Sequence, residues 1–290
     1  MRTSKTIGLL SLLVVYILAT ALGLISFIFL QDKVPLLVNI LIADAIATVF
    51  VWFMGVLLKT ASTYDPYWSI QTFIIYLSLL IYFNNFNIHT IIPLVVIGIY
   101  SIRLTWNFAV GFHDLTYIDW RYKMLAEKSG KLFQVVNLFG ICMFPTLVVF
   151  SASIPLYIYA TGEVIYSTWD LVGSGFILLG TLLEFVSDIQ MKKFIKTRTD
   201  RGQVINLGLW KYSRHPNYLG EITIWFGVAL ILIMSRFNYW YWIFGAVLNL
   251  LMFLFISIPM EEKHMKEYKP QIEEYIKTTS CLFILPRRKA

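Results

Sequence analysis

The stretch Ile7 to Leu30, IGLLSLLVVYILATALGLISFIFL, decides the fold class, because it is predominantly apolar and contains no charged residue. A helix of about 20 apolar residues crosses the hydrocarbon of a bilayer. The stretch is too long for a signal-peptide core and lacks a small-residue cleavage site, so we expect it to remain in the mature protein. Over all 290 residues, 58% are hydrophobic and 14% charged, which excludes a soluble domain, including a soluble nucleic-acid-binding module.

Further apolar runs of similar length recur along the chain and predict an all-α integral membrane protein, a bundle of seven or eight transmembrane helices. The third and seventh runs are short, so seven spans is the alternative to eight. The predicted spans are Ile7 to Leu30, Val34 to Leu58, Trp68 to Phe83, Ile88 to Val110, Phe133 to Ala160, Trp169 to Ile189, Tyr218 to Met234 and Tyr239 to Pro259.

The positive charges predict the orientation of these spans. With a cytoplasmic N-terminus, the segments on the inside hold all of the 24 Lys and Arg except Lys33, Arg236 and Arg103. Because cytoplasmic loops are enriched in Lys and Arg, both termini are expected to be cytoplasmic. The net charge of +7 is therefore explained first by topology rather than by a polyanionic partner.

No repeat and no linker divides the chain, so one membrane domain over residues 1–290 is expected. After Pro259, charges of alternating sign surround apolar residues as far as Ile276, a pattern typical of an amphipathic cytoplasmic helix on the membrane surface. Cys142 and Cys281 are far apart and lack metal-ligand spacing, which argues against a disulfide framework or a zinc site.

Charged residues inside predicted spans are costly in hydrocarbon, and each is therefore a candidate functional residue. Glu184 and Asp188 are four residues apart and lie on one helix face near the cytoplasmic end of the sixth span. They fit either a ligand site or an ion-pair network that anchors the neighbouring basic loop. The other intramembrane charges are Asp44, Arg103 and Glu221.

The segment from Gly208 to Glu221, GLWKYSRHPNYLGE, is the sharpest local feature. Pro216 favours extended backbone at the residue before it and begins the helix that follows, so an irregular basic loop is predicted to lead into a helix N-terminus. Helix N-termini and arginine side chains bind anions such as phosphate. A set of polar side chains is expected to face that place: Tyr212, Arg214, His215, Asn217, Tyr218 and, one turn deeper, Glu221.

A plainer interpretation treats this segment as a membrane anchor, with a basic loop on lipid headgroups and Trp210 and Tyr212 at the interface. Anchoring gives no reason to place Asn217 and Glu221 further inside the membrane, because a buried acid is costly there. A ligand site is therefore the preferred interpretation.

These residues resemble the membrane steroid 5-alpha-reductase family, and most closely its bacterial branch. The resemblance is strongest over about Asp170 to Leu285 and includes Asp188, the segment from Gly208 to Glu221, the pair Glu261 and Glu262, and Tyr268 and Tyr275 in the tail. Upstream it rests on Asp65 to Trp68 and on Arg103 through Trp106 and Asn107 to Arg121 and Tyr122. The resemblance implies residence in a bacterial inner membrane.

The resemblance implies that residues 132–290 bind NADPH in the cytoplasmic leaflet, while residues 1–131 meet a lipid-soluble substrate. Asp188, Asn217, Tyr218 and Glu221 would contact the nicotinamide and ribose. Arg198, Arg201 and Arg214 would hold the phosphates, and Tyr268 would help to close the pocket. The remaining candidates for cofactor binding are Arg103, Asn107, Glu184, Tyr212 and His215. No GxGxxG follows a strand, so this would not be a Rossmann site.

The implied reaction is hydride transfer to an alkene that a carbonyl activates, with a hydrogen-bond donor at the carbonyl oxygen. Tyr100, one turn before Arg103, resembles the tyrosine of the family by this spacing. The carboxyl partner is either Asp65 or Asp44, and Asp65 is preferred because it lies beside Tyr64 and Tyr67. Capping of the helix after Pro66 is the alternative role for Asp65.

The N-terminal half does not reproduce the steroid-reductase pattern, so the substrate expected is an isoprenoid, fatty or polyketide enone as readily as a steroid. A membrane methyltransferase similar to isoprenylcysteine carboxyl methyltransferase is the alternative, because such enzymes share Arg-His-Pro-x-Tyr-x-Gly and a following Glu-Glu pair but bind S-adenosylmethionine. Asn217 and the glutamate directly after Gly220 favour the reductases. A third alternative is a non-enzymatic protein that binds membrane lipid or sterol.

Overall fold

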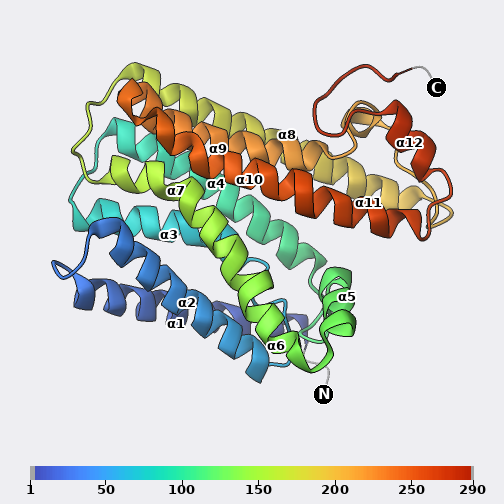
Figure 1. The fold of residues 1–290 in the computed structure, drawn as a ribbon, viewed down its shortest axis with the longest axis horizontal. Coiled ribbons are helices and arrows are strands. Elements are labelled where there is room, and N and C mark those ends of the chain that lie inside the picture. Colours follow the sequence, from blue (N-terminus) through green and yellow to red (C-terminus); the bar gives the residue numbers. More distant parts are fainter. Residues whose placement is uncertain (1–3, 289–290) are drawn as a thin grey trace. The chain divides into compact units, whose positions relative to one another are not determined.

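The computed structural model describes residues 4–288, which fold into helices and connecting loops (Figure 1). The chain forms two compact units, Met1–Val164 and Ile165–Ala290. The sequence places the division between the halves at residues 131 and 132, whereas the structure places the helices from Trp120 to Ala160 in the first unit. This difference arises because these helices pack against helices of the N-terminal region.

Among the described residues, seven helical segments are long and apolar enough to cross a membrane, which confirms an all-α protein of the membrane-spanning class. The short third predicted span is the helix Tyr67–Tyr82. It has 16 residues and is not among the seven long segments, so the number of spans is seven without it and eight with it. The fifth predicted span was expected to begin at Phe133, but its segment is helical from Trp120. The seven segments are Lys5–Leu30, Leu36–Leu57, Ile88–Gly111, Trp120–Ala160, Thr168–Thr197, Pro216–Ser235 and Phe237–Lys266.

Within the described residues, the first unit contains seven α-helices. Asn87 begins α4 with a capping box that includes Thr90, and Pro66 precedes the first residue of α3. The helices are α1 (Lys5–Leu30), α2 (Leu36–Leu57), α3 (Tyr67–Tyr82), α4 (Ile88–Gly111), α5 (Trp120–Ser129), α6 (Phe133–Val136) and α7 (Phe144–Ala160), with a 3₁₀ turn at Gly130–Leu132 and a π-helical stretch at Asn137–Met143.

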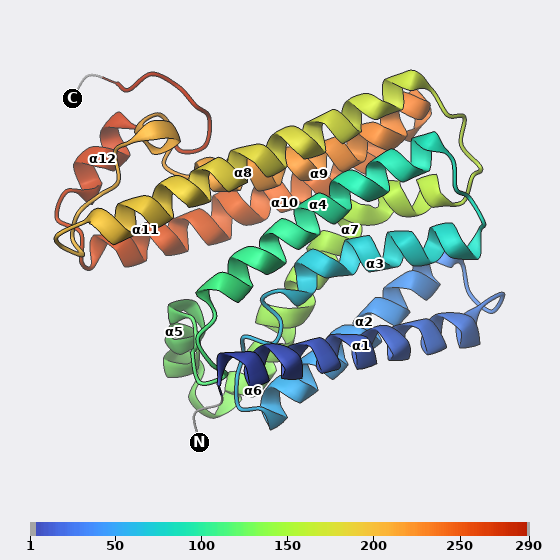
Figure 2. The same cartoon turned by 180° about the vertical axis from the view of Figure 1, so that it is seen from behind.

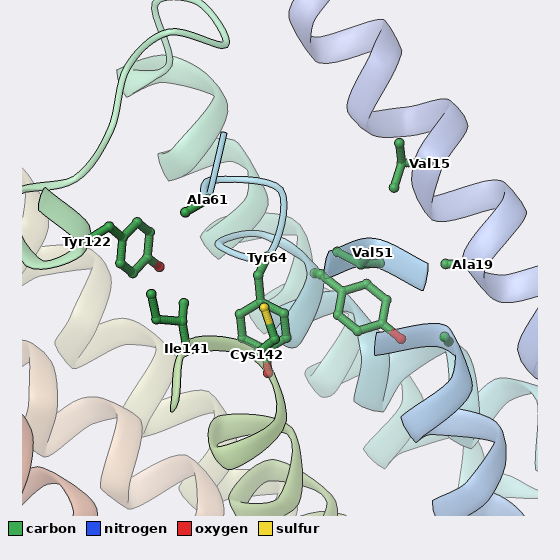
Figure 3. Packing of buried hydrophobic residues seen from close by; sticks show 10 residues of the cluster. Val15, Ala19, Val51, Ala61, Tyr64, Tyr122, Ile141 and Cys142 are labelled. Carbon is green, nitrogen blue, oxygen red and sulfur yellow. The ribbon is translucent and has the colours of Figure 1, made fainter. Parts of the chain in front are cut away.

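The core of the first unit joins α1 and α2 to the loop before α3 and to α5. Figure 3 shows Tyr64 from that loop together with Tyr122 from α5 and Cys142 from the π-helical stretch. The hydroxyl of Tyr64 is 2.7 Å from that of Thr146, which is itself 3.1 Å from Thr48 Oγ1. Hydroxyls buried in a membrane protein need such partners, and these contacts fix the loop against α2 and α7.

The second unit is built on an antiparallel pair, α8 (Leu171–Thr197) and α9 (Pro216–Ser235), which lie side by side in Figures 1 and 2. Glycines form the contact in two places. A Cβ on Gly180 would lie 2.5 Å from the carbonyl oxygen of Gly220, and one on Gly173 would lie 2.4 Å from that of Gly227. Small residues let membrane helices approach closely, so these four glycines set the separation of α8 and α9.

We expect Gly180→Ala to lower the stability of the protein, because the added methyl would overlap backbone atoms of α9. Overpacking of this kind costs about 1 to 3 kcal/mol. Gly175→Ala is the matched control, since its Cβ meets nothing within 4 Å, and removing a helical glycine should keep or raise stability by up to about 1 kcal/mol. Thermal unfolding in detergent measures both; Gly180→Ala melting as high as Gly175→Ala would contradict the assignment.

The second unit also contains shorter elements before and after α9. The described elements are α10 (Phe244–Met252), α11 (Ile258–Lys266) and α12 (Ile272–Thr278), the 3₁₀ segments Thr168–Asp170, Gly208–Lys211 and Phe237–Ile243, and a π-helical stretch Phe253–Ser257.

The tail differs from the single amphipathic helix that the charge pattern predicts. Its first part, α11, continues the last span, and the chain then turns before Pro270. The second part, α12, is amphipathic: Ile272, Tyr275 and Thr278 are buried, while Glu273 and Glu274 are exposed. Pro270 cannot donate a helical hydrogen bond, which explains why the two parts are separate helices.

Candidate functional site

The start of α9 follows the sequence prediction. His215 precedes the helix with φ −136° and ψ 59°, and Pro216 is the first helical residue. This backbone lies outside the helical region, as expected for a residue before proline. The irregular loop that ends here runs from Arg198 and includes the 3₁₀ turn Gly208–Lys211.

The anion that Arg214 and His215 hold in this structure is a carboxylate of the chain itself. Arg214 Nε donates to Glu262 Oε1 at 2.8 Å, and His215 Nε2 lies 3.1 Å from the same oxygen. Because an ionised carboxylate only accepts, Nε2 carries the proton of that hydrogen bond. Glu262 from α11 is therefore fixed against the N-terminal end of α9, where the sequence predicts an external phosphate.

Arg214 also binds the end of α12 and the segment that follows it. Its Nη1 donates to the carbonyls of Ile276 at 2.6 Å and Thr279 at 2.9 Å, and its backbone N–H donates to Ser280 O. Ser213 Oγ donates to Leu282 O at 2.6 Å. We call residues 276–282, held in this way, the C-terminal strap. The guanidinium of Arg214 thus has three acceptors within the second unit.

We expect Glu262→Gln to loosen the C-terminal strap, because the neutral amide gives up the charge-assisted contact with Arg214. Hydrogen bonds to charged groups contribute about 1.5 to 3 kcal/mol. Limited proteolysis should cut residues 276–288 faster than in the native protein. The matched control is Glu273→Gln, an exposed residue whose contact with Lys266 is 3.7 Å. Equal cleavage rates in the two variants would contradict a strap held by Glu262.

Three further predicted cofactor residues follow Pro216 in α9. The ring of Tyr218 stacks on that of His215, with centroids 5.2 Å apart and planes within 4°, and lies 4.6 Å from the ring of Phe253. Glu221 is buried and accepts a hydrogen bond from Trp225 Nε1 at 2.7 Å. Within residues 4–288, Asn217 Oδ1 is shielded from solvent and accepts no hydrogen bond, so it is open to a donor on a ligand.

Glu184 and Asp188 lie one turn apart on α8, as the spacing predicts. Glu184 is buried, and its Cγ lies 2.8 Å from where a Cβ of Gly220 would be, so this acid is packed against the first turns of α9. Tyr212, another predicted cofactor residue, is exposed, in contrast to the buried Glu184. The neighbouring Trp210 is buried and donates from Nε1 to Ser187 O at 3.0 Å, which ties the loop to α8.

A cluster of cations lies where the basic loop meets the turn before α12. Gly202 is the contact point: a Cβ there would be 3.2 Å from Tyr268 O and 3.3 Å from Pro270 Cδ. The charge of Arg198 acts on both Tyr268 and Lys269, and Arg201 is exposed on the same loop. The structure thus brings Arg198, one of the predicted phosphate ligands, together with Tyr268, and adds Lys269 and the acid Glu261.

Lys269 is the residue of this cluster that sequence reasoning missed. It is 8% exposed, and among the described residues the one hydrogen bond of its Nζ is to Met265 Sδ, 3.5 Å away. Burial lowers the pKa of Lys269, Glu261 opposes that shift, and the charge of Arg198 adds to it. A buried ammonium without an oxygen acceptor is costly, so the cluster favours an anion. The sequence feature that could have indicated a turn at Lys269 is Pro270, the residue that directly follows it.

The first unit holds the remaining candidates. Tyr100 is fully buried on α4. Arg103 follows it by three residues and Asn107 follows Arg103 by four, so the three side chains lie on the same face of the helix, and the last two are half-buried. Ser101 on the neighbouring face donates to Ser69 O at 2.7 Å and fixes α4 to α3.

Asp65 is half-buried in the loop before α3, and its Oδ1 accepts a hydrogen bond from the hydroxyl of Tyr122. It does not cap α3, because Pro66 is the N-cap and no side chain bonds there. Burial raises the pKa of Asp65, against the opposing effects of Tyr122 and Arg121. The hydrogen-bonded tyrosine beside Asp65 is thus Tyr122, whereas the sequence predicts that Asp65 or Asp44 acts together with Tyr100. Asp44, the alternative acid, is bonded by Tyr67 and Gln71.

Comparison with known proteins places this architecture in a family. The chain is 25% identical over 272 residues to an uncharacterized protein of Schizosaccharomyces pombe, an alignment that covers 85% of this chain and 79% of that protein. No solved structure matches. A family model described as "Protein of unknown function (DUF1295)" matches residues 51–279, which include the loop before α3, the first turns of α9 and the strap up to Thr279. The chain belongs to this DUF1295 family of proteins.

Proposed function

We propose that this protein is an NADPH-dependent membrane reductase that acts on a carbon–carbon double bond of a lipophilic enone. The observation that carries the proposal is the cluster of Arg198 and Lys269 beside Tyr268, in which Lys269 is buried and the one hydrogen bond of its ammonium among the described residues is to the thioether of Met265. Arg201, three residues after Arg198 on the same loop, is exposed. Phosphates are the biological anions that such clusters bind most commonly.

The charge of this cluster separates the two cofactors under consideration. NADPH carries a pyrophosphate and a 2′-phosphate, whereas S-adenosylmethionine has no phosphate and offers the cluster only its single carboxylate. Asn217 Oδ1 and the buried Glu221 add acceptors at the start of α9. Acceptors of this kind suit the amide and ribose hydroxyl donors of a nicotinamide nucleoside. The site therefore favours NADPH over S-adenosylmethionine.

The residues of the first unit suit the proposed reaction. Bound NADPH would supply the hydride for the β carbon of the enone. The phenol of Tyr100 would donate a hydrogen bond to the carbonyl oxygen, where negative charge develops, and its burial excludes water that would weaken this contact. Burial raises the pKa of Asp65, which accepts a hydrogen bond from Tyr122, and Asp65 is the acid that we propose for this reaction.

We further propose that both termini face the cytoplasm of a bacterial cell, with the protein in the inner membrane. The distribution of Lys and Arg supports this orientation. The loop from Arg198 to Arg214 would then face the compartment that supplies NADPH, and a lipophilic substrate would enter from the bilayer.

Binding measurements on the purified protein in lipid nanodiscs test the proposal. NADPH, NADH and S-adenosylmethionine are titrated separately by isothermal calorimetry. We expect NADPH to bind more tightly than NADH by at least tenfold, because NADH lacks the 2′-phosphate. Tighter binding of S-adenosylmethionine than of NADPH would contradict the reductase and support the alternative of a methyltransferase. If none of the three compounds binds, the result would support the non-enzymatic alternative, a protein that binds membrane lipid.

A further inference from the structure

The first unit contains a cavity whose wall includes Asp44, the alternative acid, but neither Tyr100 nor Asp65. It has a volume of about 250 Å³ and lies between α1, α2 and α3, which run next to one another in Figure 2. Most of its wall is aliphatic or aromatic. Among the lining residues are Ala43, Ile74 and Leu79, with Gly23 leaving space on the side of α1.

One end of this cavity reaches the apolar outer surface of the unit. Ile28 at the end of α1 and Ile81 at the end of α3 both line it, and these side chains are 65% and 62% exposed. In a membrane-spanning unit, exposed aliphatic side chains on apolar helices face lipid rather than water. A molecule that enters here would therefore come from the bilayer.

The inner part of the cavity is polar. Asp44 of α2 accepts hydrogen bonds from the hydroxyl of Tyr67 and from Nε2 of Gln71, so both of its oxygens are engaged. Gln71 is 4% exposed and lines the cavity. Its other amide atom, Oε1, accepts no hydrogen bond from any described residue. A buried carbonyl without a donor is costly, which indicates that a ligand supplies the donor.

We infer that this cavity binds a lipophilic molecule that carries a hydroxyl group, with the hydroxyl donating to Gln71 Oε1 and the apolar body lying between α1 and α3. A ligand that offers only acceptors, such as a simple ketone, ester or ether, cannot satisfy this carbonyl. A cationic head group would have to leave water for a largely aliphatic wall, while Asp44 is already held by two donors. A neutral alcohol meets all of these conditions.

The inference does not depend on NADPH binding, because the cavity and its polar end belong to the first unit alone. A protein that binds no dinucleotide would still be expected to take up the alcohol. Conversely, if the protein binds NADPH and reduces an enone but does not bind the alcohol, this inference is wrong and the proposed function is unaffected.

Photolabelling tests the inference. The probes are dodecan-1-ol bearing a diazirine on its chain and the methyl ether of the same molecule, which keeps the chain and loses the donor. The protein in nanodiscs is irradiated with each, and labelled peptides are mapped by mass spectrometry. We expect saturable labelling within residues 19–28 and 67–82 by the alcohol, at least fivefold above the ether, with competition by unlabelled dodecan-1-ol.

Two variants identify the contacts. Gln71→Leu removes the acceptor at similar volume and should bring the labelling by alcohol and ether to the same level. Ala43→Phe fills the cavity and should reduce labelling by both probes. Gln134→Leu is the matched control, since Gln134 is exposed and lies outside the cavity. Thermal unfolding confirms that each variant is folded.

Several outcomes would overturn the inference. Equal labelling of the native protein by alcohol and ether removes the role of the hydroxyl, and labelling that does not saturate indicates ordinary lipid contact. A folded Gln71→Leu variant that keeps the preference for the alcohol also contradicts it. If Gln71→Leu does not fold, the comparison of the two probes on the native protein decides alone.

Discussion

NADPH is expected to bind about 100-fold more weakly when Lys269→Met and Arg198→Ala are combined. A hydrogen bond to a charged group contributes about 1.5 to 3 kcal/mol, and 1.4 kcal/mol corresponds to a factor of ten in affinity, so each cation accounts for about tenfold. Methionine keeps the length and the apolar stem of Lys269, which limits the change to the ammonium. Calorimetric titration of the double variant against the native protein measures the effect.

Lys266→Met is the matched control, because Lys266 is exposed in the same tail and is 3.7 Å from Glu273. It should bind NADPH as the native protein does. If Lys266→Met and the double variant both lose affinity for NADPH, the effect would come from the overall positive charge of the tail and not from a specific site at Lys269 and Arg198. Unchanged affinity in the double variant would remove the phosphate assignment.

The same lysine predicts how NADPH binding changes with pH. Anion binding needs the protonated ammonium, and burial lowers the pKa of Lys269. Affinity should therefore decline as pH rises through that lowered pKa, at lower pH than an ordinary lysine would cause. Lys269→Met should show no such decline in calorimetric titrations from neutral to alkaline pH; the same decline in this variant would assign it to another group.

Tyr100→Phe is expected to lower the turnover of an enone substrate about 100-fold while leaving NADPH affinity unchanged. Loss of a single donor at a developing oxyanion reduces kcat about 10²- to 10³-fold. The measurement is consumption of NADPH in nanodiscs with a panel of lipophilic enones, together with calorimetric titration of NADPH. Full activity in this variant would remove Tyr100 from the mechanism.

Tyr76→Phe is the control for loss of a buried hydroxyl in the first unit, because the hydroxyl of Tyr76 bonds a backbone carbonyl, Thr90 O, at 3.2 Å. It should affect stability more than turnover. Tyr122→Phe and Asp65→Asn are informative beside it, since these two residues form one hydrogen-bonded pair. If Asp65 serves as the acid, Asp65→Asn lowers turnover, and Tyr122→Phe alters its pH dependence.

The sequence predicted the features that depend on local chemistry. Pro216 determines the start of α9, and the apolar runs determine the spans, because each property is carried by a few neighbouring residues. The position of Glu262 beside Arg214 could not be predicted, since it depends on how α11 lies against the loop before α9. The break before α12 was hidden because the charge pattern continues across Pro270.

The missed site residues have a similar physical reason. Lys269 is one of many lysines in a charged tail, and only its burial, with a sulfur atom as partner, separates it from the others. Gln71 is an uncharged residue in an apolar helix, and sequence gives no sign that one of its amide atoms lacks a partner. For Lys269 and Gln71 alike, the important property is a buried polar atom that lacks an oxygen or nitrogen partner among the described residues, and a sequence pattern does not encode this property.

The C-terminal strap has a consequence for the order in which the protein is made. Arg214 bonds to Ile276 and Thr279, which are 62 and 65 residues further along the chain, and Ser213 bonds to Leu282, 69 residues further. During translation, the loop before α9 emerges from the ribosome well before these partners exist. The entrance to α9 therefore reaches its final arrangement only after α10, α11 and α12 have been synthesised, so this region should be among the last to resist protease in a nascent chain.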